Sequence, residues 1–463
     1  MRKQYCVAMT IAGLDPDGGA GIVADIKTFT ALGVYATVAL TGIAVQNTYE
    51  PGRVYEVPAI AVEEQIDFVA RDMGIDAAKT GMLYSSEIVE VVAKCAKRYG
   101  FKLVIDPVIK GKVGINLLKP QGLKILIEGL IPLATIVTPN IREAELITGI
   151  KINDIKDMER AAKYIVDVLG AKAAVIKGGH APFKEAIDIL YIDGEFKEFK
   201  APRIINGCWH GAGCSFSAAA TAFLALGKSI VESIKLAKKF TMHAARYGFK
   251  GLGRGACPIS PESWIEMDAE RYKVLDNIRK AIELLESSGE LLAPLIPEVQ
   301  MNLVMALPKR YVHDLNDVAG VLGRIIKYGN KVKAAGPPTF GASKHLARAV
   351  LKAMEYNSQI RSAINIKYDP KIIEIAKSLG LKISSYDRRK EPPHVKRIEG
   401  ASIPWGIEEA IRRLKGQVPD IVYHLGDWGK EPMINVFGIS ALDVARKVIE
   451  IAKEYSKILK EPS

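Results

Sequence analysis

The chain has 463 residues, of which 49% are hydrophobic, and its 64 lysines and arginines against 52 aspartates and glutamates give a net charge of +12. This length predicts two or three domains that each bury a core, and the composition excludes a disordered or fibrous protein. The charge suits phosphorylated small molecules, nucleic acid or an anionic membrane. However, the basic residues are mixed with acidic ones, and no apolar segment reaches membrane-spanning length. We therefore expect neither a nucleic-acid partner nor a membrane partner.

Five cysteines, at positions 6, 95, 208, 214 and 257, include no Cys-x-x-Cys pair. An odd number without such pairs predicts reduced thiols and a cytoplasmic location. Cys208, His210 and Cys214 have no fourth ligand at the spacing of a structural zinc site, so zinc is not expected.

The chain begins with an apolar, partly β-branched run at 5–11, which predicts a buried strand. A glycine-rich loop follows at 13–21, and residues 22–32 have the apolar spacing of a helix. A strand, a glycine loop and a helix in this order are typical of a ligand-binding corner, although helix packing alone also needs glycines there.

Apolar runs and helical patterns then alternate to about residue 250. Strands are predicted at 37–45, 76–81, 102–106, 135–138 and 172–177, and helices at 62–73, 86–99 and 157–169. This alternation predicts an α/β fold, a doubly wound and mostly parallel sheet with helices on both faces. Ligands bind beyond the carboxyl ends of such strands. The polar or adaptable residues at these ends are Gln46, Lys79 with Met82, Asp106, Asn140 with Glu143, and Lys177.

A second glycine loop, at 206–213, precedes an alanine-rich helix. The backbone N–H groups of Ala212, Gly213 and Cys214 are expected to bind a phosphate at the positive end of this helix. The same field should lower the pKa of Cys214, which would then serve as a base or as a hydrogen-bond partner of a substrate hydroxyl. The alternative is a buried, inert cysteine at an ordinary helix start.

Eight short motifs in the first half of the chain resemble, in order, those of hydroxymethylpyrimidine and phosphomethylpyrimidine kinases of the ribokinase superfamily. They lie at 10–13, 17–21, 24–29, 79–82, 106–108, 138–140, 177–180 and 211–214. The resemblance covers residues 1 to about 250 and implies a ribokinase-like fold. It also implies that ATP, with Mg²⁺, phosphorylates 4-amino-5-hydroxymethyl-2-methylpyrimidine to the monophosphate and then to the diphosphate.

Carried over position by position, the resemblance implies a pyrimidine pocket, a metal site and a nucleotide-phosphate site. The residues of the implied pocket are Asp25, Gln46, Met82 and Val108. The acids that would organise Mg²⁺ are Glu143 and Asp106. The residues implied for the phosphates are Lys112, Asn140, Lys177, Gly211, Ala212 and Gly213, with Cys214 as the catalytic residue.

A domain boundary is predicted where prolines interrupt the pattern. Pro258 and Pro261 end the kinase-like part, an amphipathic helix follows from about 267 to 286, and two further prolines come soon after it. We therefore predict a first domain at 1–257, a linker at 258–298 and a second domain at 299–463. The second domain opens with a strand at 302–307, and Ser343 is expected to N-cap a helix that runs to residue 354.

Stretches of the second domain resemble the ThiN-type thiamine-phosphate synthase, at 323–324, 340–345, 387–388, 405–410 and 429–432. The resemblance implies a smaller α/β domain that joins the pyrimidine diphosphate to thiazole phosphate and releases pyrophosphate. The residues expected to hold the leaving charge are Arg324 and His345 as catalytic groups, with Ser343, Arg388 and Lys430 as substrate contacts.

Together these features predict a bifunctional enzyme of thiamine biosynthesis, which we expect to be a homodimer. One alternative is a second domain that only senses thiamine phosphate. Regulators with that domain carry a helix-turn-helix module ahead of it, and none is legible here. The other alternative is a pyridoxal-type kinase, against which Gln46 and Met82 favour the pyrimidine.

Overall fold

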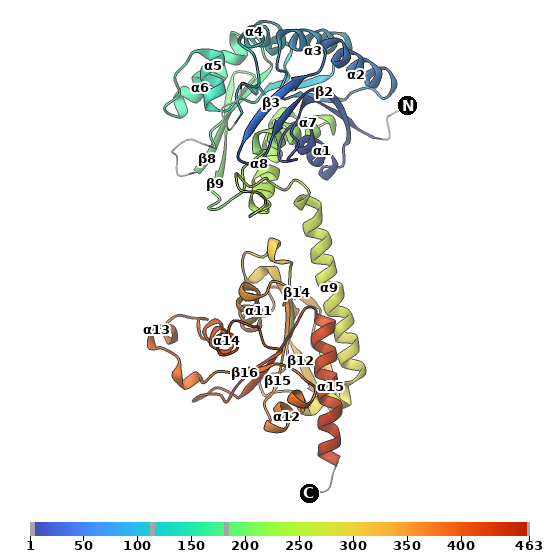
Figure 1. Ribbon diagram of the computed structural model, residues 1–463, viewed down its shortest axis with the longest axis vertical. Helices are drawn as coiled ribbons and strands as arrows, with labels where there is room; N and C mark the ends of the chain where they lie inside the picture. Colours follow the sequence, from blue (N-terminus) through green and yellow to red (C-terminus); the bar gives the residue numbers. More distant parts are fainter. Residues whose placement is uncertain (1–4, 112–115, 180–184, 461–463) are drawn as a thin grey trace. The chain divides into compact units, whose positions relative to one another are not determined.

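The computed structural model describes residues 5–111, 116–179 and 185–460, and the chain divides into two compact units, Met1–Glu266 and Met267–Ser463 (Figure 1). The boundary falls within helix α9 (Ser263–Ser287), which starts four residues before the predicted helix. Most of α9 belongs to the second unit, because its apolar residues Val274, Ile278 and Leu285 are buried and Asn277 accepts a hydrogen bond from the Leu442 N–H. Much of the predicted linker is therefore part of a folded unit.

The first unit contains a nine-stranded sheet in the order β3-β2-β1-β4-β5-β6-β7-β8-β9. The strands are β1 (Val7–Leu14), β2 (Tyr35–Gln46), β3 (Pro51–Glu56), β4 (Ala77–Thr80), β5 (Lys102–Ile105), β6 (Ile136–Val137), β7 (Ala173–Lys177), β8 (Glu185–Ile192) and β9 (Glu195–Pro202). The six central strands from β2 to β7 are parallel, which confirms the predicted fold class. The antiparallel strands β3, β8 and β9 at the two edges were not predicted.

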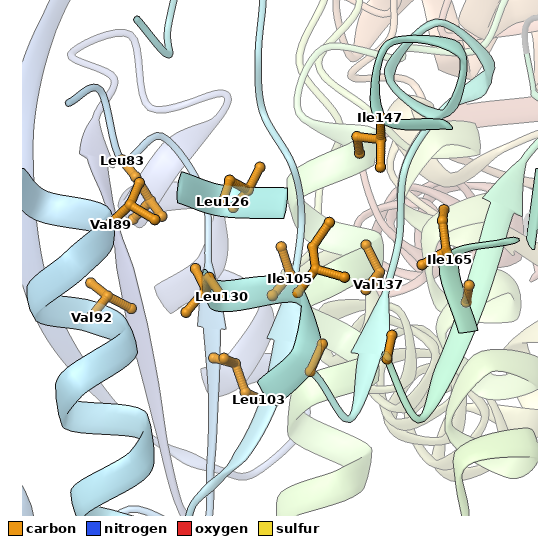
Figure 2. Close-up of a cluster of buried hydrophobic side chains, with 14 of the residues drawn as sticks. Leu83, Val89, Val92, Leu103, Ile105, Leu126, Leu130, Val137, Ile147 and Ile165 are labelled. Atoms are coloured by element: carbon orange, nitrogen blue, oxygen red, sulfur yellow. The ribbon is translucent and has the colours of Figure 1, made fainter. Parts of the chain in front are cut away.

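Helices cover both faces of this sheet. They are α1 (Gly21–Ala31), α2 (Ala59–Asp72), α3 (Ser86–Tyr99), α4 (Pro120–Ile125), α5 (Ile141–Thr148), α6 (Ile155–Asp167), α7 (Ala212–Ala225) and α8 (Ile230–Arg246). Leu103 and Ile105 of β5 pack with residues of α2 to α6, as Figure 2 shows for part of this cluster. Val104, between them, packs instead with Phe216 of α7 and Phe240 of α8. Because side chains alternate along a strand, burial on both faces gives the continuous apolar runs seen in the sequence.

The topological switch point of the sheet lies between β1 and β4. The chain leaves β1 toward β2 on one side and leaves β4 toward β5 on the other, so the two connections diverge. Open α/β sheets bind ligands in the crevice at such a point, beyond the carboxyl ends of the strands. The first glycine loop follows β1, and Met82 follows β4, so both are placed at this crevice.

The second unit contains a seven-stranded sheet in the order β14-β11-β10-β15-β18-β17-β16 and a separate hairpin of β12 and β13. The strands are β10 (Leu303–Ala306), β11 (Val318–Val321), β12 (Ile325–Tyr328), β13 (Lys331–Ala334), β14 (Pro338–Phe340), β15 (Ser362–Lys367), β16 (Ile383–Ser385), β17 (Ile421–His424) and β18 (Met433–Gly438). Only the β16–β17 pair of the large sheet is parallel among the described strands. Helices α11 (Lys344–Tyr356) and α14 (Ser402–Arg413) pack on one face, and α15 (Ala441–Lys460) lies on the other (Figure 1).

Candidate active sites

The two glycine loops of the first unit are in direct contact. Gly211, the N-cap of α7, has a φ of +84°, and a Cβ built on it would lie 1.7 Å from the carbonyl oxygen of Gly19. A Cβ on Gly19 would in turn lie 2.3 Å from the His210 ring. Positive φ is strained for residues with a side chain, and here the contact removes the space as well. Gly211 is therefore required for the loops to approach each other, and a side chain at Gly19 would require the His210 ring to move.

A buried ion pair lies close to this contact. The Lys79 Nζ is 3.0 Å from both carboxylate oxygens of Asp25, and the Thr10 hydroxyl donates to the same carboxylate at 2.6 Å. Both charged side chains are fully buried. Burial alone would lower the pKa of Lys79, but the Asp25 carboxylate raises it above its ordinary value, so Lys79 keeps its charge. Burial raises the pKa of Asp25, against the opposing effects of Lys79 and Thr10.

A second cation lies at the start of α7. The Lys177 Nζ is 3.0 Å from Asp106 Oδ1, and Ser217 donates to the other oxygen of Asp106 at 3.1 Å. A Cβ on Gly213 would lie 3.6 Å from that Nζ, so Lys177 lies beside the helix start. The Ala212 N–H donates to the Trp209 carbonyl, so the expectation that it binds an anion is wrong. Gly213, the second residue of α7, therefore places its N–H in the first turn of the helix, beside Lys177.

The Glu143 carboxyl is held by the local structure of α5. Asn140 and Glu143 form a capping box, in which the Asn140 N–H donates to Glu143 at 2.8 Å and the Glu143 N–H donates to the Asn140 side chain at 3.0 Å. Burial raises the pKa of Glu143 to about 7, while Lys177 lowers it and Asp106 raises it further. Asn140 also pairs with Lys177 as a parallel bridge. The sequence-predicted residues Asp106, Asn140, Glu143 and Lys177 therefore lie together.

Cys214 differs from the sequence expectation. Burial raises the pKa of its thiol to about 11, and the opposing effect of Lys79 does not overcome burial and the nearby acids Asp25 and Asp106. The prediction of a lowered pKa is wrong because the helix field acts on a group that protein surrounds. At neutral pH the side chain is an uncharged thiol. It can exchange hydrogen bonds with a substrate hydroxyl, but it is a weak base.

The remaining predicted pocket residues lie at strand ends around the switch point. Gln46 is the last residue of β2, and Met82 follows β4, with its methyl group against Gly13 and Gly42. Asp106 and Val108 line a small cavity of about 10 Å³, roughly the space of one water. Lys112 lies outside the described residues, so the predicted lysine of the phosphate loop has no structural account.

A group that the sequence analysis missed lies where the two glycine loops meet. The His210 Nε2 is 3.3 Å from Asp15 Oδ2 and 3.2 Å from Asp17 Oδ1. Each member of this trio offers one atom that could bind a metal ion, and in the described part of the chain these three atoms lie within 4.8 Å of one another. Asp15 is almost fully buried. The trio joins the first glycine loop to the second, and Asp17 and His210 are 193 residues apart in sequence, which hides the contact.

The prediction of five reduced cysteines is also wrong. Cys208 and Cys257 form a disulfide, with their Cα atoms 5.0 Å apart, while Cys6, Cys95 and Cys214 remain thiols. The pairing arises because residues near 257 return alongside the second glycine loop, where the His210 N–H donates to the Cys257 carbonyl and the Ile259 N–H donates to the His210 carbonyl. A separation of 49 residues gives no local sequence signal for this bond.

In the second unit the four predicted basic residues gather around α11. Burial lowers the pKa of His345, and four nearby cations lower it further: Arg348, Arg324, Lys430 and Arg388. The Glu431 carboxylate accepts the N–H groups of Glu298 and Val299, and the Arg324 guanidinium donates to the Val299 carbonyl. The loop that carries Lys430 and the segment that carries Arg324 are thus both hydrogen-bonded to the backbone of residues 298–299.

These cations lack the paired acids seen in the first unit. No carboxylate of the described residues lies within 4.0 Å of the charged atoms of Arg348, Arg388 or Lys430. Ser343 is the N-cap of α11, but its side chain makes no capping hydrogen bond, so that part of the expectation is wrong. A helix start with an unpaired cation cluster beside it can bind a polyanion.

Comparison with known proteins agrees with this geometry. The sequence profile of the phosphomethylpyrimidine kinase family matches residues 15–260, and that of the thiamine-phosphate synthase ThiN family matches residues 277–450. The bifunctional thiamine biosynthesis protein ThiDN of Methanocaldococcus jannaschii is 34% identical over 98% of this chain and 100% of its own length. The chain belongs to this bifunctional family.

The kinase unit of this family member has further relatives. The hydroxymethylpyrimidine/phosphomethylpyrimidine kinase of Bacillus subtilis is 41% identical, over 55% of this chain and 93% of its own length. The pyridoxal kinase of Staphylococcus aureus, solved in complex with AMP-PCP and pyridoxal, is 34% identical, with a TM-score of 0.53 over 57% of this chain and 96% of that one. These likenesses support the ribokinase-like fold and a nucleotide site in the first unit.

Three groups at these sites were not singled out from the sequence as functional residues. Lys79 was noted only as a polar strand end, His210 only as a rejected zinc ligand, and Arg348 not at all. A basic residue one helical turn after His345 was the signal available for Arg348, because residues three apart share a helix face. Among the described residues, no helix is both long and apolar enough to span a bilayer.

Proposed function

We propose that the two units catalyse successive parts of thiamine biosynthesis. The first unit phosphorylates hydroxymethylpyrimidine to its mono- and diphosphate with ATP, and the second joins the diphosphate to thiazole phosphate, giving thiamine phosphate and pyrophosphate. The observation that carries this proposal is that both family profiles match in order along one chain. A homodimer in the cytoplasm remains part of the proposal, and light scattering would test the dimer.

In the kinase unit, phosphoryl transfer requires positioning and neutralised charge more than covalent chemistry. Lys177 and the N–H of Gly213 are placed to hold phosphate oxygens at the α7 start. The uncharged Cys214 thiol then hydrogen-bonds the substrate hydroxyl and orients it. A loose transition state demands little basicity from that thiol, so a pKa of about 11 is compatible with this role.

The acids Asp106 and Glu143 fit Mg²⁺, which we propose as the metal cofactor. Mg²⁺ prefers oxygen ligands and is commonly bound by one or two carboxylates together with substrate phosphates and water. Both carboxylates are already oriented, Asp106 by Lys177 and Ser217 and Glu143 by Asn140. When bound there, the ion would neutralise charge on the nucleotide phosphates.

In the synthase unit, departure of pyrophosphate leaves a cation that the aminopyrimidine stabilises, so the protein must hold the leaving anion. We assign this task to Arg324, Arg388 and Lys430, with Arg348 added from the structure. His345 is neutral at pH 7, so it donates a hydrogen bond to the anion as an imidazole rather than as a cation.

Two other functions remain as competing outcomes. The similarity to solved pyridoxal kinases favours pyridoxal as a second substrate of the kinase unit. A sensing role of the second unit would need only ground-state affinity for thiamine phosphate, whereas a synthase must bind the transition state more tightly than the substrate.

One assay with the full chain separates these functions. Purified protein receives hydroxymethylpyrimidine, thiazole phosphate and Mg-ATP, and thiamine phosphate is measured by mass spectrometry. Omitting ATP should abolish the product, and supplying the pyrimidine diphosphate should restore it. A protein that binds thiamine phosphate yet never forms it from supplied diphosphate and thiazole phosphate has a sensing second unit. A higher kcat/KM for pyridoxal than for the pyrimidine would reassign the first unit.

A further inference from the structure

The carboxyl ends of β16 and β17 lead into the two loops that carry Arg388 and Lys430. These two strands are parallel, with Ser385 opposite Tyr423, so their carboxyl ends lie at the same edge of the sheet. His424 is the last residue of β17, and it is only 5% exposed. It therefore lies at the edge of the sheet from which both cation-bearing loops start.

The His424 ring is held in place by packing. It contacts the Tyr386 ring, with the two centroids 5.2 Å apart and the ring planes at 53°. Tyr386 is itself buried, the Trp405 ring meets it edge-on, and a Cβ built on Gly406 would lie 2.3 Å from its ring. Because Tyr386 fills its space so closely, the neighbouring imidazole has little room to turn.

One nitrogen of this ring binds the loop that follows β17. The Gly426 N–H donates to His424 Nδ1 at 3.2 Å, and both groups are buried. An N–H can donate only to an unprotonated ring nitrogen, so this bond requires a neutral imidazole with its proton on Nε2. Burial and the nearby Arg388 lower the pKa of His424 to about 4, so the ring is neutral at pH 7. The bond is therefore intact at neutral pH.

Gly426 in turn packs against the backbone of Lys430. Its φ is +81°, and a Cβ built on it would lie 2.3 Å from the Lys430 carbonyl oxygen. That carbonyl accepts the Asp427 N–H at 3.2 Å, and the Lys430 N–H donates to the Asp427 carbonyl at 2.8 Å. Residues 427–430 thus form a closed turn that starts at Gly426. A displacement of Gly426 would therefore displace Lys430 as well.

We propose that His424 is a positioning residue of the synthase unit, which fixes the 426–430 loop through its Nδ1 atom so that Lys430 is in place to hold the leaving pyrophosphate. The proposal rests on the task assigned to Lys430 above. A lysine side chain is a flexible point charge, so the position of its backbone decides where the ammonium group can reach. A group that stabilises developing charge acts best when it is in place before the reaction. His424 acts through Gly426 and Lys430 and does not touch the reacting atoms.

Two substitutions separate the roles of the two ring nitrogens. In His424→Asn the side-chain oxygen occupies the position of Nδ1, so it can still accept the Gly426 N–H. In His424→Gln the amide lies near the position of Nε2 instead, and the acceptor for Gly426 is lost. The two variants are therefore matched controls for each other, because both replace the ring by a neutral amide.

The assay supplies the full chain with pyrimidine diphosphate and thiazole phosphate and measures thiamine phosphate. We expect His424→Gln to lower kcat about tenfold, the typical effect of losing one hydrogen bond. The KM for thiazole phosphate should not change, because the loop acts on the leaving group of the other substrate. His424→Asn should keep most of the activity, and both variants should keep the parental kinase activity. The affinity for inorganic pyrophosphate, measured by calorimetry, should follow the same order.

A double-variant cycle tests the route through Lys430. The variant His424→Gln/Lys430→Ala should be no less active than Lys430→Ala alone, because His424 acts only through that side chain. Should either amide variant fail to fold, His424→Leu, which also lacks an acceptor, takes its place in this cycle, and additivity with Lys430→Ala decides.

Several results would overturn the inference. Activity that His424→Gln keeps and His424→Asn loses would show that Nε2 contacts the substrate directly. Parental activity in both variants, equal losses in both, or losses that add to that of Lys430→Ala would contradict it as well. If Lys430→Ala is as active as the parent, the task assigned to Lys430 is wrong and the inference fails with it. A parent that forms no thiamine phosphate contradicts the proposed function instead, and the order of pyrophosphate affinities then decides the inference.

Discussion

The two units handle charge in opposite ways at their proposed anion sites. In the kinase unit each central cation is paired with a buried acid, Lys79 with Asp25 and Lys177 with Asp106, both at 3.0 Å. In the synthase unit, Arg388 and Lys430 have no such partner among the described residues. A nucleotide that arrives with Mg²⁺ brings partly neutralised phosphates, so a balanced site suffices. A released pyrophosphate is a concentrated negative charge, and an unbalanced cation cluster suits it.

The largest effect that we expect concerns the paired site. Lys79→Met leaves the fully buried Asp25 carboxylate without its cation, and breaking a buried pair in this way typically costs about 3–5 kcal/mol. The free energy of unfolding of the kinase unit should fall by that amount in denaturant titrations.

The control for this prediction is the double variant Lys79→Met/Asp25→Leu. It should recover most of the lost stability, because no unpaired charge remains. If Lys79→Met unfolds at the same denaturant concentration as the parent protein, then breaking the pair does not lower the free energy of unfolding.

The unpaired site should behave in the contrary way. Arg388→Ala or Lys430→Ala removes a cation from a cluster of like charges, so stability should change by no more than about 0.5 kcal/mol. Thiamine-phosphate formation should nevertheless fall about 10²-fold, the scale of losing one charge-stabilising group, with kinase turnover unchanged. If either variant lowers the melting temperature strongly but hardly changes the rate of thiamine-phosphate formation, these cations stabilise the fold, and the contrast with the kinase unit is wrong.

A smaller effect sharpens the role of Cys214. With its pKa raised to about 11, the thiol stays protonated through neutral pH, and the thiolate fraction grows only tenfold per pH unit as the pH rises toward 11. Cys214→Ala should lower kcat about 10²-fold. Cys214→Ser, which keeps an uncharged hydrogen-bonding group, should retain much of the activity. If Ser is as poor as Ala and the parental kcat rises tenfold per pH unit above pH 7, the thiolate is the base.

The smallest effect concerns His345. Burial and four cations lower its pKa, so the proton is lost below the usual pH of about 6.5. Pyrophosphate neutralises those cations and should therefore raise the pKa of His345, as an opposite charge nearby does. NMR titration of the imidazole with and without pyrophosphate measures this, with His345→Gln used to assign the signal. An unchanged pKa would place pyrophosphate away from the cluster.

The sequence predicted those parts of the fold and sites that local signals encode. Helix α3 was predicted at its observed bounds because Ser85 caps its start and Gly100 ends it with a φ of +65°. The motifs also placed Asp106 and Lys177 at the ends of β5 and β7, and Glu143 lies near them in the first turn of α5. The edge strands β3, β8 and β9 were missed, although the exposed alternation of β9 carried a strand signal.

Contacts between distant residues could not be predicted in the same way. The partners Lys79 and Asp25 are 54 residues apart and meet only because β4 lies beside β1. The Cys208–Cys257 bond depends on a returning segment without regular structure. The pKa of Cys214 depends on how much protein surrounds the helix start, which spacing does not reveal.

The disulfide and its neighbours have a practical consequence for dividing the chain. The segment 257–259 completes the second glycine loop, because it supplies both the bond to Cys208 and the backbone partners of His210. Trp264 packs against Phe240 and His243 of α8 a few residues later. An expression plasmid that stops at residue 257, where the sequence placed the domain end, would keep Cys257 but discard Ile259 and Trp264. One that stops at Glu266 keeps them, and the kinase fragment should then be purified without added reductant.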